Sequence, residues 1–420
     1  MRLLLTTDLF APIIGGAERQ VGLLAVALLA SGHEVRVATT AQPGLPARET
    51  IGGVPVDRLS AAATAIPAPG GGRRFLAPVP DPVLSVGLRR LVNDWHPDVV
   101  HASGWIGYSS AAAVADQVAP VVLSVRDYGH ACATRTLLWR DRTPCDGPSL
   151  GRCLDCAGRH YGAARALIAV GGIRAGRPFL RRSVRAIHSV SRFVQHTVQR
   201  DLIGDDQGWR PILECIDDVV PGSPEPLEAA DHDLLTRLPA SPFILFVGAL
   251  QAHKGLGVLL EAWARMGERA RDDGDRPPLV LIGTRWPETP ETFPADVTVL
   301  SDVPHRVVMA AWERCLFGVV PSVWPDPLPG VVREPMTRGR PVIGSDIGGI
   351  PDMIVHERSG LLVPAGDAIA LAAAMRRLAA DEALRERLGD AGRASVSALT
   401  PASVAARFEA LYARVLDAAG

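Results

Sequence analysis

The sequence has 420 residues, 47% of them apolar, and its 44 Lys and Arg against 45 Asp and Glu leave a formal net charge of -1. This length exceeds what one hydrophobic core usually serves, so two domains are expected. The near balance of charge argues against nucleic acid as a partner, and the lack of any run of about eighteen apolar residues argues against a membrane-spanning helix.

The first half of the chain alternates short apolar runs with helical patterns. The apolar run at residues 3–6 is followed immediately by polar residues, so it is too short for a signal peptide. It is predicted as a buried strand. A cytoplasmic protein is therefore expected. A helix opened by Gly15 and Gly16 and ending near residue 31 follows, and residues 42–80 are predicted as a loop region rich in Pro, Ala and Gly. Further strands are predicted at residues 34–39, 98–102, 121–125 and 185–190.

The second half repeats this alternation after an expected linker at residues 221–226. Strands are predicted at residues 243–247, 279–282, 297–300, 317–320 and 341–344, with helices between them. The expected fold class is α/β, with two doubly wound, Rossmann-like domains facing each other across a cleft. Their predicted bounds are 1–215 and 216–400. A last helix at residues 401–420 is expected to pack against the first domain.

A strand-loop-helix junction in the second half carries two carboxylates, Asp326 and Glu334, around a helix that starts near Gly330. Open α/β sheets hold ligands beyond the carboxyl ends of their strands, and a helix N-terminus there favours an anion such as diphosphate. Lys254 follows another strand, in the loop that begins at Gly248, and supplies a point charge suited to phosphate; a solvated surface lysine is the alternative. The glycine at position 15 is compatible with two interpretations: it either lets a ligand approach the backbone closely or simply forms a turn.

The motifs around this junction resemble glycosyltransferase family 4. Residues 326–343 are similar to the segment of that family with two acidic residues eight positions apart, and residues 348–352, 360–364, 190–193 and 15–18 extend the resemblance over nearly the whole chain. Members of this family are retaining enzymes with the GT-B fold. The resemblance implies transfer of a sugar from a nucleotide-sugar donor, a UDP- or GDP-sugar, to an acceptor hydroxyl, with no cofactor or metal required for catalysis.

The resemblance also implies roles for individual residues. Glu334 would hold the donor ribose, Asp326 would contact the transferring sugar in place of the family's usual Glu, and Lys254 would neutralise the departing diphosphate. The other residues implied on the donor side are Gly15, Gly16, Gly248, Pro329, Gly330, Val331 and Val332.

Besides Asp326, two further positions depart from the family pattern. Ala249 stands where the family usually has Arg, so a phosphate cation is either missing or supplied by Arg285 or Arg333. Arg126 stands before Asp127, where many members have His. On the acceptor and sugar side, His101 or His130 then replaces that His, or each is simply a packed or solvated imidazole. The residues implied on this side are His101, Arg126, Asp127 and His130.

Four cysteines lie in a turn-rich segment at residues 127–160. Cys132, Cys145, Cys153 and Cys156 provide the ligand count of a structural zinc site, although their spacing is irregular. Reduced buried cysteines or a disulfide pair are the alternatives. A metal here would order a long loop rather than take part in the chemistry.

A basic run at residues 174–185 is compatible either with a solvated helix face or with contact to anionic lipid, which would make the protein membrane-associated. The acceptor itself is expected to be a sugar, a lipid or a small molecule. The leading hypothesis is a retaining glycosyltransferase of the hexosyltransferase kind. A nucleotide-sugar epimerase with the GT-B fold and a degenerate nucleotide-sugar-binding subunit are the alternatives.

Overall fold

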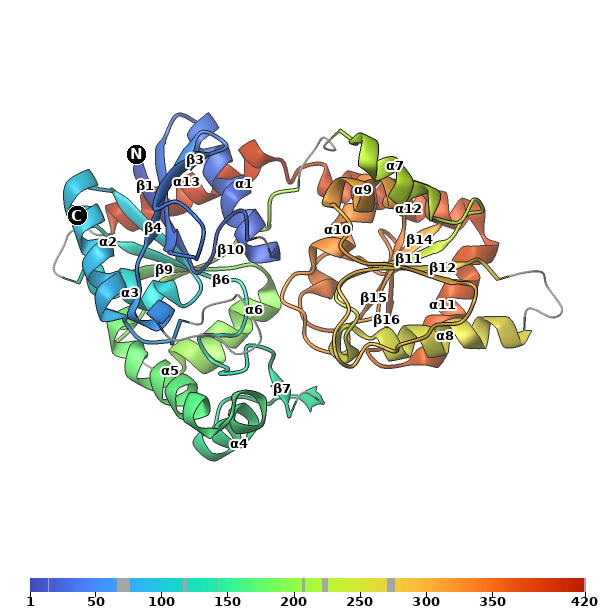
Figure 1. The fold of residues 1–420 in the computed structure, drawn as a ribbon, viewed down its shortest axis with the longest axis horizontal. Coiled ribbons are helices and arrows are strands. Elements are labelled where there is room, and N and C mark those ends of the chain that lie inside the picture. Colours follow the sequence, from blue (N-terminus) through green and yellow to red (C-terminus); the bar gives the residue numbers. More distant parts are fainter. Residues whose placement is uncertain are drawn as a thin grey trace. The chain divides into compact units, whose positions relative to one another are not determined.

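The computed structural model describes residues 1–13, 15–65, 76–115, 119–140, 142–205, 208–220, 226–269 and 276–418. The chain divides into two compact units (Figure 1). Unit 1 comprises Met1–Val219 and Pro401–Gly420, and unit 2 comprises Val220–Thr400. Of the linker predicted at 221–226, the first five residues lie outside the described part of the chain.

Unit 1 is built on an eight-stranded sheet in which every neighbouring pair is parallel except β3 and β4. Its strands, in spatial order, are β10 (Ile212–Cys215), β9 (Val184–Ser189), β6 (Val121–Val125), β5 (Val99–Ser103), β1 (Arg2–Thr7), β2 (Glu34–Thr40), β4 (Val54–Leu59) and β3 (Arg48–Ile51). A mostly parallel sheet is therefore confirmed for the first half of the sequence.

The expectation of a loop at residues 42–80 was wrong for its middle part. β3 and β4 form a hairpin there, joined by Gly52 and Gly53, which both have positive φ angles of 57° and 82°. Two such residues make the tight turn whose twist matches that of a hairpin, and glycine adopts it without strain. The Gly-Gly pair in the sequence is typical of a hairpin turn, but the many Pro and Ala residues around it favoured the prediction of a loop.

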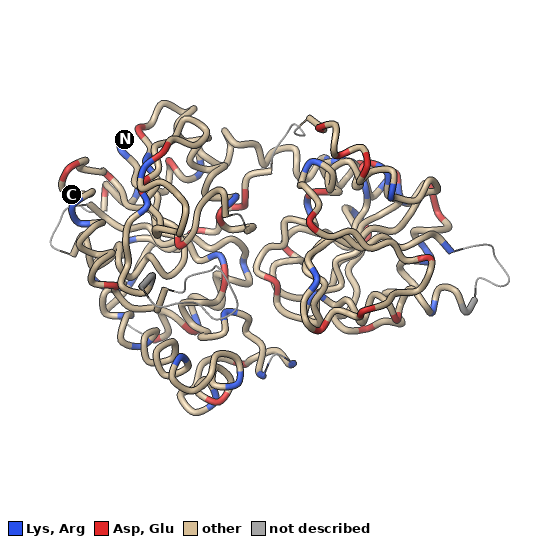
Figure 2. Tube along the Cα trace, in the orientation of Figure 1, with Lys and Arg blue, Asp and Glu red and all other residues tan. Residues whose placement is uncertain are grey.

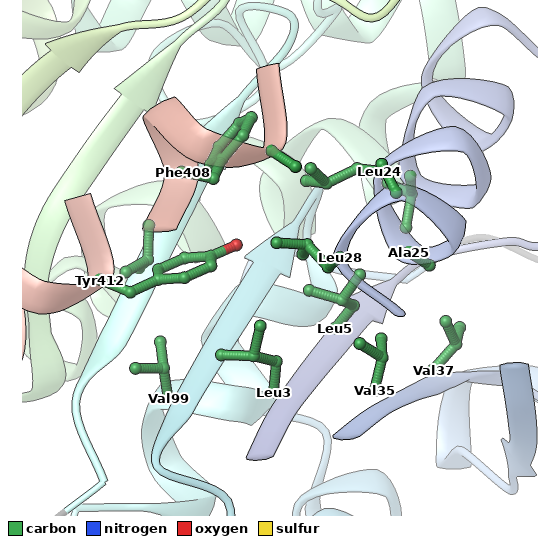
Figure 3. Close-up of a cluster of buried hydrophobic side chains, with 14 of the residues drawn as sticks. Leu3, Leu5, Leu24, Ala25, Leu28, Val35, Val37, Val99, Phe408 and Tyr412 are labelled. Carbon is green, nitrogen blue, oxygen red and sulfur yellow. The ribbon is translucent and has the colours of Figure 1, made fainter. Parts of the chain in front are cut away.

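Helices cover both faces of this sheet. They are α1 (Gly16–Ala30), α2 (Pro82–Trp95), α3 (Ile106–Ala113), α4 (Leu150–Tyr161), α5 (Ala163–Ser183), α6 (Arg192–Thr197) and α13 (Pro401–Asp417), with short helical turns at Ala62–Ala65 and Val198–Ile203. α1 and α13 share one core with the sheet, which contains Leu24 and Leu28 of α1, Phe408 and Tyr412 of α13, and Leu3 and Leu5 of β1 (Figure 3). The last helix thus belongs to unit 1. A small two-stranded sheet, β7 (Leu138–Trp139) with β8 (Thr143–Pro144), lies in the cysteine-containing segment.

Unit 2 is built on a six-stranded, fully parallel sheet. Its strands, in spatial order, are β13 (Val297–Leu300), β12 (Leu279–Ile282), β11 (Ile244–Val247), β14 (Phe317–Val320), β15 (Val342–Ser345) and β16 (Leu361–Val363). Its helices are α7 (Ala229–Thr236), α8 (Leu256–Arg269), α9 (His305–Arg314), α10 (Gly330–Thr337), α11 (Ala368–Ala380) and α12 (Glu382–Val396), with turns at Ala252–Lys254 and Ile350–Asp352. The five strands predicted here are confirmed, and β16 was missed.

The strand order places a switch point in each sheet, where successive crossovers leave in opposite directions. In unit 2 the switch lies between β11 and β14, and in unit 1 it lies between β1 and β5. Ligands in open α/β sheets bind beyond the carboxyl ends of the strands at such a point. The loops after these four strands are therefore the places to look for a functional site.

Candidate functional site

The switch point of unit 2 holds an ion pair between the loops after β11 and β14. The Lys254 ammonium lies 2.5 Å from Oδ2 of Asp326, and the side chains are 26% and 7% exposed. The same ammonium lies 5.0 Å from the centre of the Trp324 ring, close enough for a cation–π contact. The sequence predicted both charged residues at this edge of the sheet, and the structure brings them into direct contact.

Glycines allow the three loops at this edge to approach one another. Gly255 follows Lys254 in the sequence and has a φ of 80°. It lies so close to the loop after β14 that a Cβ would be 1.8 Å from the carbonyl oxygen of Pro321. Gly348, with φ of 63°, has its Cα so near the backbone of Asp326 that a Cβ would lie 2.5 Å from its carbonyl oxygen. The N–H of Gly349 donates to that oxygen at 2.8 Å. The backbone of Asp326 is therefore held by the loop that contains Gly348 and Gly349.

Lys254 is the only lysine in the 420-residue sequence, so the other 43 of the 44 basic residues are arginines. An ammonium is a compact point charge on a flexible chain, whereas a guanidinium is a planar fork that needs more room. A chain that uses Arg at every other basic position retains Lys where it meets Asp326.

α10 begins beside this pair, with Pro329 as its N-cap residue and no side chain capping its first turn. The backbone N–H of Val332 donates to the Pro329 carbonyl at 3.0 Å. Around Gly330 there is open space, since a Cβ there would meet nothing within 4 Å. The first N–H groups of a helix carry a partial positive charge, so this end of α10 suits an anion.

Glu334 lies in the second half of α10 and is fixed by side chains of α9. Its Oε1 lies 3.0 Å from His305 Nε2, and its Oε2 accepts a hydrogen bond from Trp312 Nε1 at 3.1 Å. Each carboxylate oxygen has two lone pairs, so both can still accept from a ligand hydroxyl. The contacts orient the carboxylate, and its role at a ribose stays a prediction.

The loop after β11 is held by backbone contacts rather than by an arginine. Gly248 donates its N–H to the Ile282 carbonyl at 2.9 Å. A Cβ at Gly283 would lie 1.7 Å from the Gly248 carbonyl oxygen, so the loop after β12 lies directly against Ala249 and its neighbour. Of the two substitute cations, Arg333 is buried, and Arg285 donates to the Pro290 carbonyl at 3.1 Å.

The switch point of unit 1 holds a second charged cluster, which the sequence revealed only in part. Asp127, after β6, accepts hydrogen bonds from Arg135 Nε at 2.9 Å and from the Gly129 N–H at 2.7 Å. Burial alone would raise the pKa of the Asp127 carboxyl, but Arg135 and this N–H outweigh it and hold the pKa below its usual range. Asp127 is thus anionic at neutral pH.

Asp8, after β1, completes this cluster and was not predicted. Its two carboxylate oxygens accept from the backbone N–H groups of Trp105 and Ile106 at 3.1 and 2.7 Å, at the start of α3. Burial raises the pKa of Asp8, against the opposing effect of Arg135. The only feature of the sequence that could have identified Asp8 as a site residue is its position directly after the first strand. No feature of the sequence identified Arg135, because its backbone lies in a left-handed turn with φ of 66°.

The two histidines proposed for the sugar side lie in different settings. His130 is 3% exposed, and its Nδ1 lies 3.3 Å from the Tyr108 hydroxyl. Burial lowers the pKa of His130 to about 4, so it is neutral at physiological pH. It borders a small pocket with Asp127 and the residues of α6. His130 is therefore close to the charged cluster.

His101 belongs to a buried hydrogen-bond chain instead. His188 Nε2 lies 2.9 Å from the Ile216 carbonyl, which only accepts, so His188 Nδ1 must accept from Ser124 at 2.7 Å. Ser124 in turn accepts from His101 Nε2 at 2.6 Å, and His101 Nδ1 accepts from the Tyr412 hydroxyl at 2.8 Å. Burial lowers the pKa of both histidines to about 3. This arrangement leaves no ring nitrogen of His101 for a sugar.

Arg126 pairs with Asp218, in the last residues of unit 1 before the chain enters unit 2, at 2.5 Å. The side-chain amide of Gln20 in α1 holds the backbone of the neighbouring Val219: its Nε2 donates to the Val219 carbonyl, and its Oε1 accepts from the Val219 N–H, each at 3.0 Å. These side chains and His101 line an open pocket that encloses about 360 Å³ of empty space, part of it open to solvent. Arg126 thus anchors the end of the unit.

The two glycines at the start of α1, Gly15 and Gly16, have no strained conformation. The Gly15 N–H donates to Glu18 Oε2 at 3.0 Å, which closes the first turn of the helix. A Cβ at Gly16 would meet nothing within 4 Å. The predicted close approach of a ligand to Gly16 is compatible with this open space and stays a prediction.

The four clustered cysteines are free thiols. Cys156 Sγ is directed at the Leu138 carbonyl at 3.5 Å, whereas burial and the nearby thiols of Cys132 and Cys145 raise the pKa of Cys153. Within the described ranges, no group of three or more His, Cys, Asp or Glu side chains is arranged to hold a metal ion. The four cysteines as they lie here do not fit a zinc ion. Among the described helices, none has the length and apolar character needed to cross a membrane.

Comparisons with known proteins agree with this architecture. A family model described as a glycosyl transferase 4-like domain matches residues 15–207, and one described as glycosyl transferases group 1 matches residues 241–381. The fold is GT-B, as predicted, and the two matches support a GT-B glycosyltransferase of the family 4 type.

Particular relatives are similar over part or all of the chain. The alpha-D-kanosaminyltransferase of Streptomyces kanamyceticus is 32% identical over 158 residues, which cover 36% of this chain and 39% of that relative, so the alignment spans about two fifths of its length. The structure of sucrose-phosphate synthase from Thermosynechococcus elongatus has a TM-score of 0.72 at 20% identity and covers 99% of both chains. Anabaena HepE, solved in complex with UDP-glucose, has a TM-score of 0.66 at 15% identity, covering 98% of this chain and 99% of that one.

Proposed function

We propose that this protein is a retaining glycosyltransferase that moves a sugar from a UDP- or GDP-sugar to an acceptor hydroxyl without a required metal. The observation that carries the proposal is the pairing of Lys254 with Asp326 at the switch point of unit 2, made by the only lysine of the chain. The similarity in fold to HepE, which was solved with UDP-glucose, supports a nucleotide-sugar donor.

The site offers the two contributions that a leaving diphosphate needs. Lys254 supplies a cation on a flexible chain, and the start of α10 at Gly330 and Val331 supplies backbone N–H groups. Glu334, oriented by Trp312, receives the ribose hydroxyls. Asp326 holds Lys254 before the donor binds and contacts the sugar afterwards. Catalysis then rests on positioning and on stabilising the charge of the leaving group.

The acceptor side belongs to unit 1. The cluster of Asp8, Asp127 and Arg135 presents acceptors and donors for the hydroxyl groups of a sugar, a lipid headgroup or a small molecule. His130 lies nearby as a neutral imidazole. A hexosyl group is the expected cargo, because the family resemblance extends to the carboxylate that contacts the sugar.

Amine-selective labelling tests the donor site directly, because Lys254 carries the only side-chain amine. Mass spectrometry would follow reductive methylation of Lys254, with the Met1 amine as an internal control, in the presence of UDP-, GDP- or ADP-sugars. Protection of Lys254 alone, matched by a rise in melting temperature with the same donor, is expected. If no nucleotide sugar protects Lys254 and none raises the melting temperature, the proposal is rejected.

Product analysis separates the alternatives. A transferase gives a glycoside whose anomeric configuration, read by NMR, equals that of the donor, and it needs an acceptor. An epimerase converts the donor with no acceptor present. A degenerate binding subunit protects Lys254 but turns nothing over. Replacement of Glu334 by Ala should abolish donor binding, and unchanged turnover would reject its assignment to the ribose.

A further inference from the structure

α5 presents a fixed outer face because its inner face is tightly packed. Gly172 and Gly176 lie against Pro78 and Tyr108, where a Cβ at Gly176 would come within 2.4 Å of the Pro78 carbonyl oxygen. Leu180, farther along the inner face, is fully buried. Such close contacts prevent α5 from rotating about its axis. The side chains on the opposite face are therefore held toward solvent.

That outer face carries three large apolar side chains. Leu167 is 62% exposed, Ile168 is 54% exposed and Phe179 is 36% exposed. Leu167, Arg174 and Arg181 follow one another at intervals of seven residues, or about two helical turns, so they lie in one row. Ile168 and Arg182 lie in the adjacent row. The face thus carries large apolar side chains with arginines beside and beyond them.

Arginines are concentrated in this region of the chain, without acidic residues among them. Residues 156–200 contain nine arginines and no Asp, Glu or Lys. Because the whole chain has a formal charge of -1, the remaining residues carry -10 (that is, -1 minus 9). Figure 2 shows basic positions recurring along α5, whereas both acidic and basic positions are found over unit 2.

We propose that the outer face of α5 docks on the surface of an anionic lipid bilayer. Leu167, Ile168 and Phe179 would enter the boundary between headgroups and acyl chains, and Arg174 and Arg182 would contact lipid phosphates. An interfacial helix combines apolar insertion with attraction of Arg to anionic lipid. Single exposed aliphatic side chains are common on solvated surfaces, but Leu167 and Ile168 are adjacent and lie beside arginines on one helix face, the combination expected of an interfacial helix. Single-stranded nucleic acid is instead bound by stacking on aromatic side chains. This docking is independent of the proposed sugar transfer.

Co-sedimentation with vesicles tests the proposal on the full chain. Phosphatidylcholine vesicles with and without phosphatidylglycerol, at equal total lipid, give the reference binding. The wild-type protein should bind the anionic vesicles and lose binding as salt rises. Leu167→Gln with Ile168→Gln should weaken this binding by about tenfold or more, and Arg174→Gln with Arg182→Gln by roughly thirtyfold.

Ile369→Gln is the matched control, since Ile369 is 65% exposed in unit 2 and should leave binding unchanged. Unaltered melting temperature and unaltered donor-induced stabilisation in each variant show that the fold and the donor site are intact. Failure of sugar transfer with vesicle binding retained would count against the proposed function alone. The proposal would be overturned if the protein bound neutral vesicles equally well or bound no vesicles. It would also be overturned if the protein bound DNA with an affinity unchanged by the Leu167 and Ile168 substitutions, or if those substitutions abolished a self-association of the protein.

Discussion

The ammonium of Lys254 lies 2.5 Å from the carboxylate of Asp326, although 72 residues separate the two in the chain. The contact arises because β11 and β14 are neighbours at the switch point of the unit 2 sheet. An ion pair of this kind holds the cation in position while no ligand is bound. A diphosphate that enters the site competes with Asp326 for the same charge.

Replacing Lys254 by Met should reduce transfer roughly 100-fold or more, because the leaving diphosphate loses its cation. The same change leaves the 7%-exposed Asp326 without its cation and should lower the free energy of unfolding by about 1–3 kcal/mol. Adding Asp326→Asn should restore much of this stability but not the activity. Equal activity in Lys254→Met and the wild type would contradict the assignment.

Lys254→Arg is the more discriminating change, because the chain uses Arg at all its other basic positions. We expect it to fold normally and to lose activity, since the planar guanidinium fills space that the donor needs. Steady-state kinetics with the donor found by thermal shift would measure this. Full activity in the arginine variant would mean that charge alone matters at this position.

Two glycine substitutions separate stability from ligand binding. Gly348→Ala should destabilise unit 2 by at least about 2 kcal/mol, because its φ is 63° and the added Cβ would lie 2.5 Å from the Asp326 carbonyl oxygen. Gly330→Ala meets no atom within 4 Å and should change stability by no more than about 0.5 kcal/mol, but it should weaken donor binding. Urea unfolding and donor titration give the two readings. Wild-type donor affinity in Gly330→Ala would place the diphosphate elsewhere.

The buried chain of His101 and His188 predicts loss of stability in acid. The pKa of each is about 3 in the folded protein against an ordinary 6.5, so between these pH values the unfolded chain binds protons that the folded chain does not. Stability should therefore fall as pH decreases from 6.5, by about 1.4 kcal/mol per pH unit for each histidine. The buried His130, whose pKa is lowered to about 4, contributes in the same direction, so His188→Gln should remove about a third of the combined histidine slope in urea unfolding at pH 7 and pH 5. His160→Gln, on the exposed side of α4, is the control, and equal slopes in all three proteins would contradict the prediction.

Metal analysis decides the state of the cysteines. With Cys156 directed at a backbone carbonyl, we expect less than one zinc per chain in the purified protein and no change in Cys156→Ser. Elemental analysis of both proteins, purified without chelator, measures this. One zinc per wild-type chain that is lost in Cys156→Ser would instead establish the metal site suggested by the cysteine count, with residues 127–160 arranged around it.

Much of the architecture follows from local patterns in the sequence. Short apolar runs separated by helical segments predicted two parallel α/β domains, because a strand buried on both faces must be apolar throughout. Polar residues directly after two of these runs predicted that Lys254 and the Asp326 loop meet at one edge of a sheet, because parallel strands end at the same edge. The hairpin of β3 and β4 and the strands β10 and β16 escaped prediction. β3, β10 and β16 lie at sheet edges and have only three or four residues, whereas β4 lies between β2 and β3 in a segment rich in Pro, Ala and Gly.

Only the tertiary structure decided which side chains meet. His101 was a candidate for the sugar side until the fold placed Tyr412, 311 residues away, against one ring nitrogen and Ser124 against the other. Arg135 joins Asp8 and Asp127 through a left-handed turn that the sequence does not signal. The arginine run of α5 gained its meaning from Leu167 and Ile168 beside it, exposed because Gly172 and Gly176 fix the rotation of the helix. Periodicity in a sequence records whether a residue is buried, whereas its partners depend on the order of strands and the rotation of helices, which only the packed chain determines.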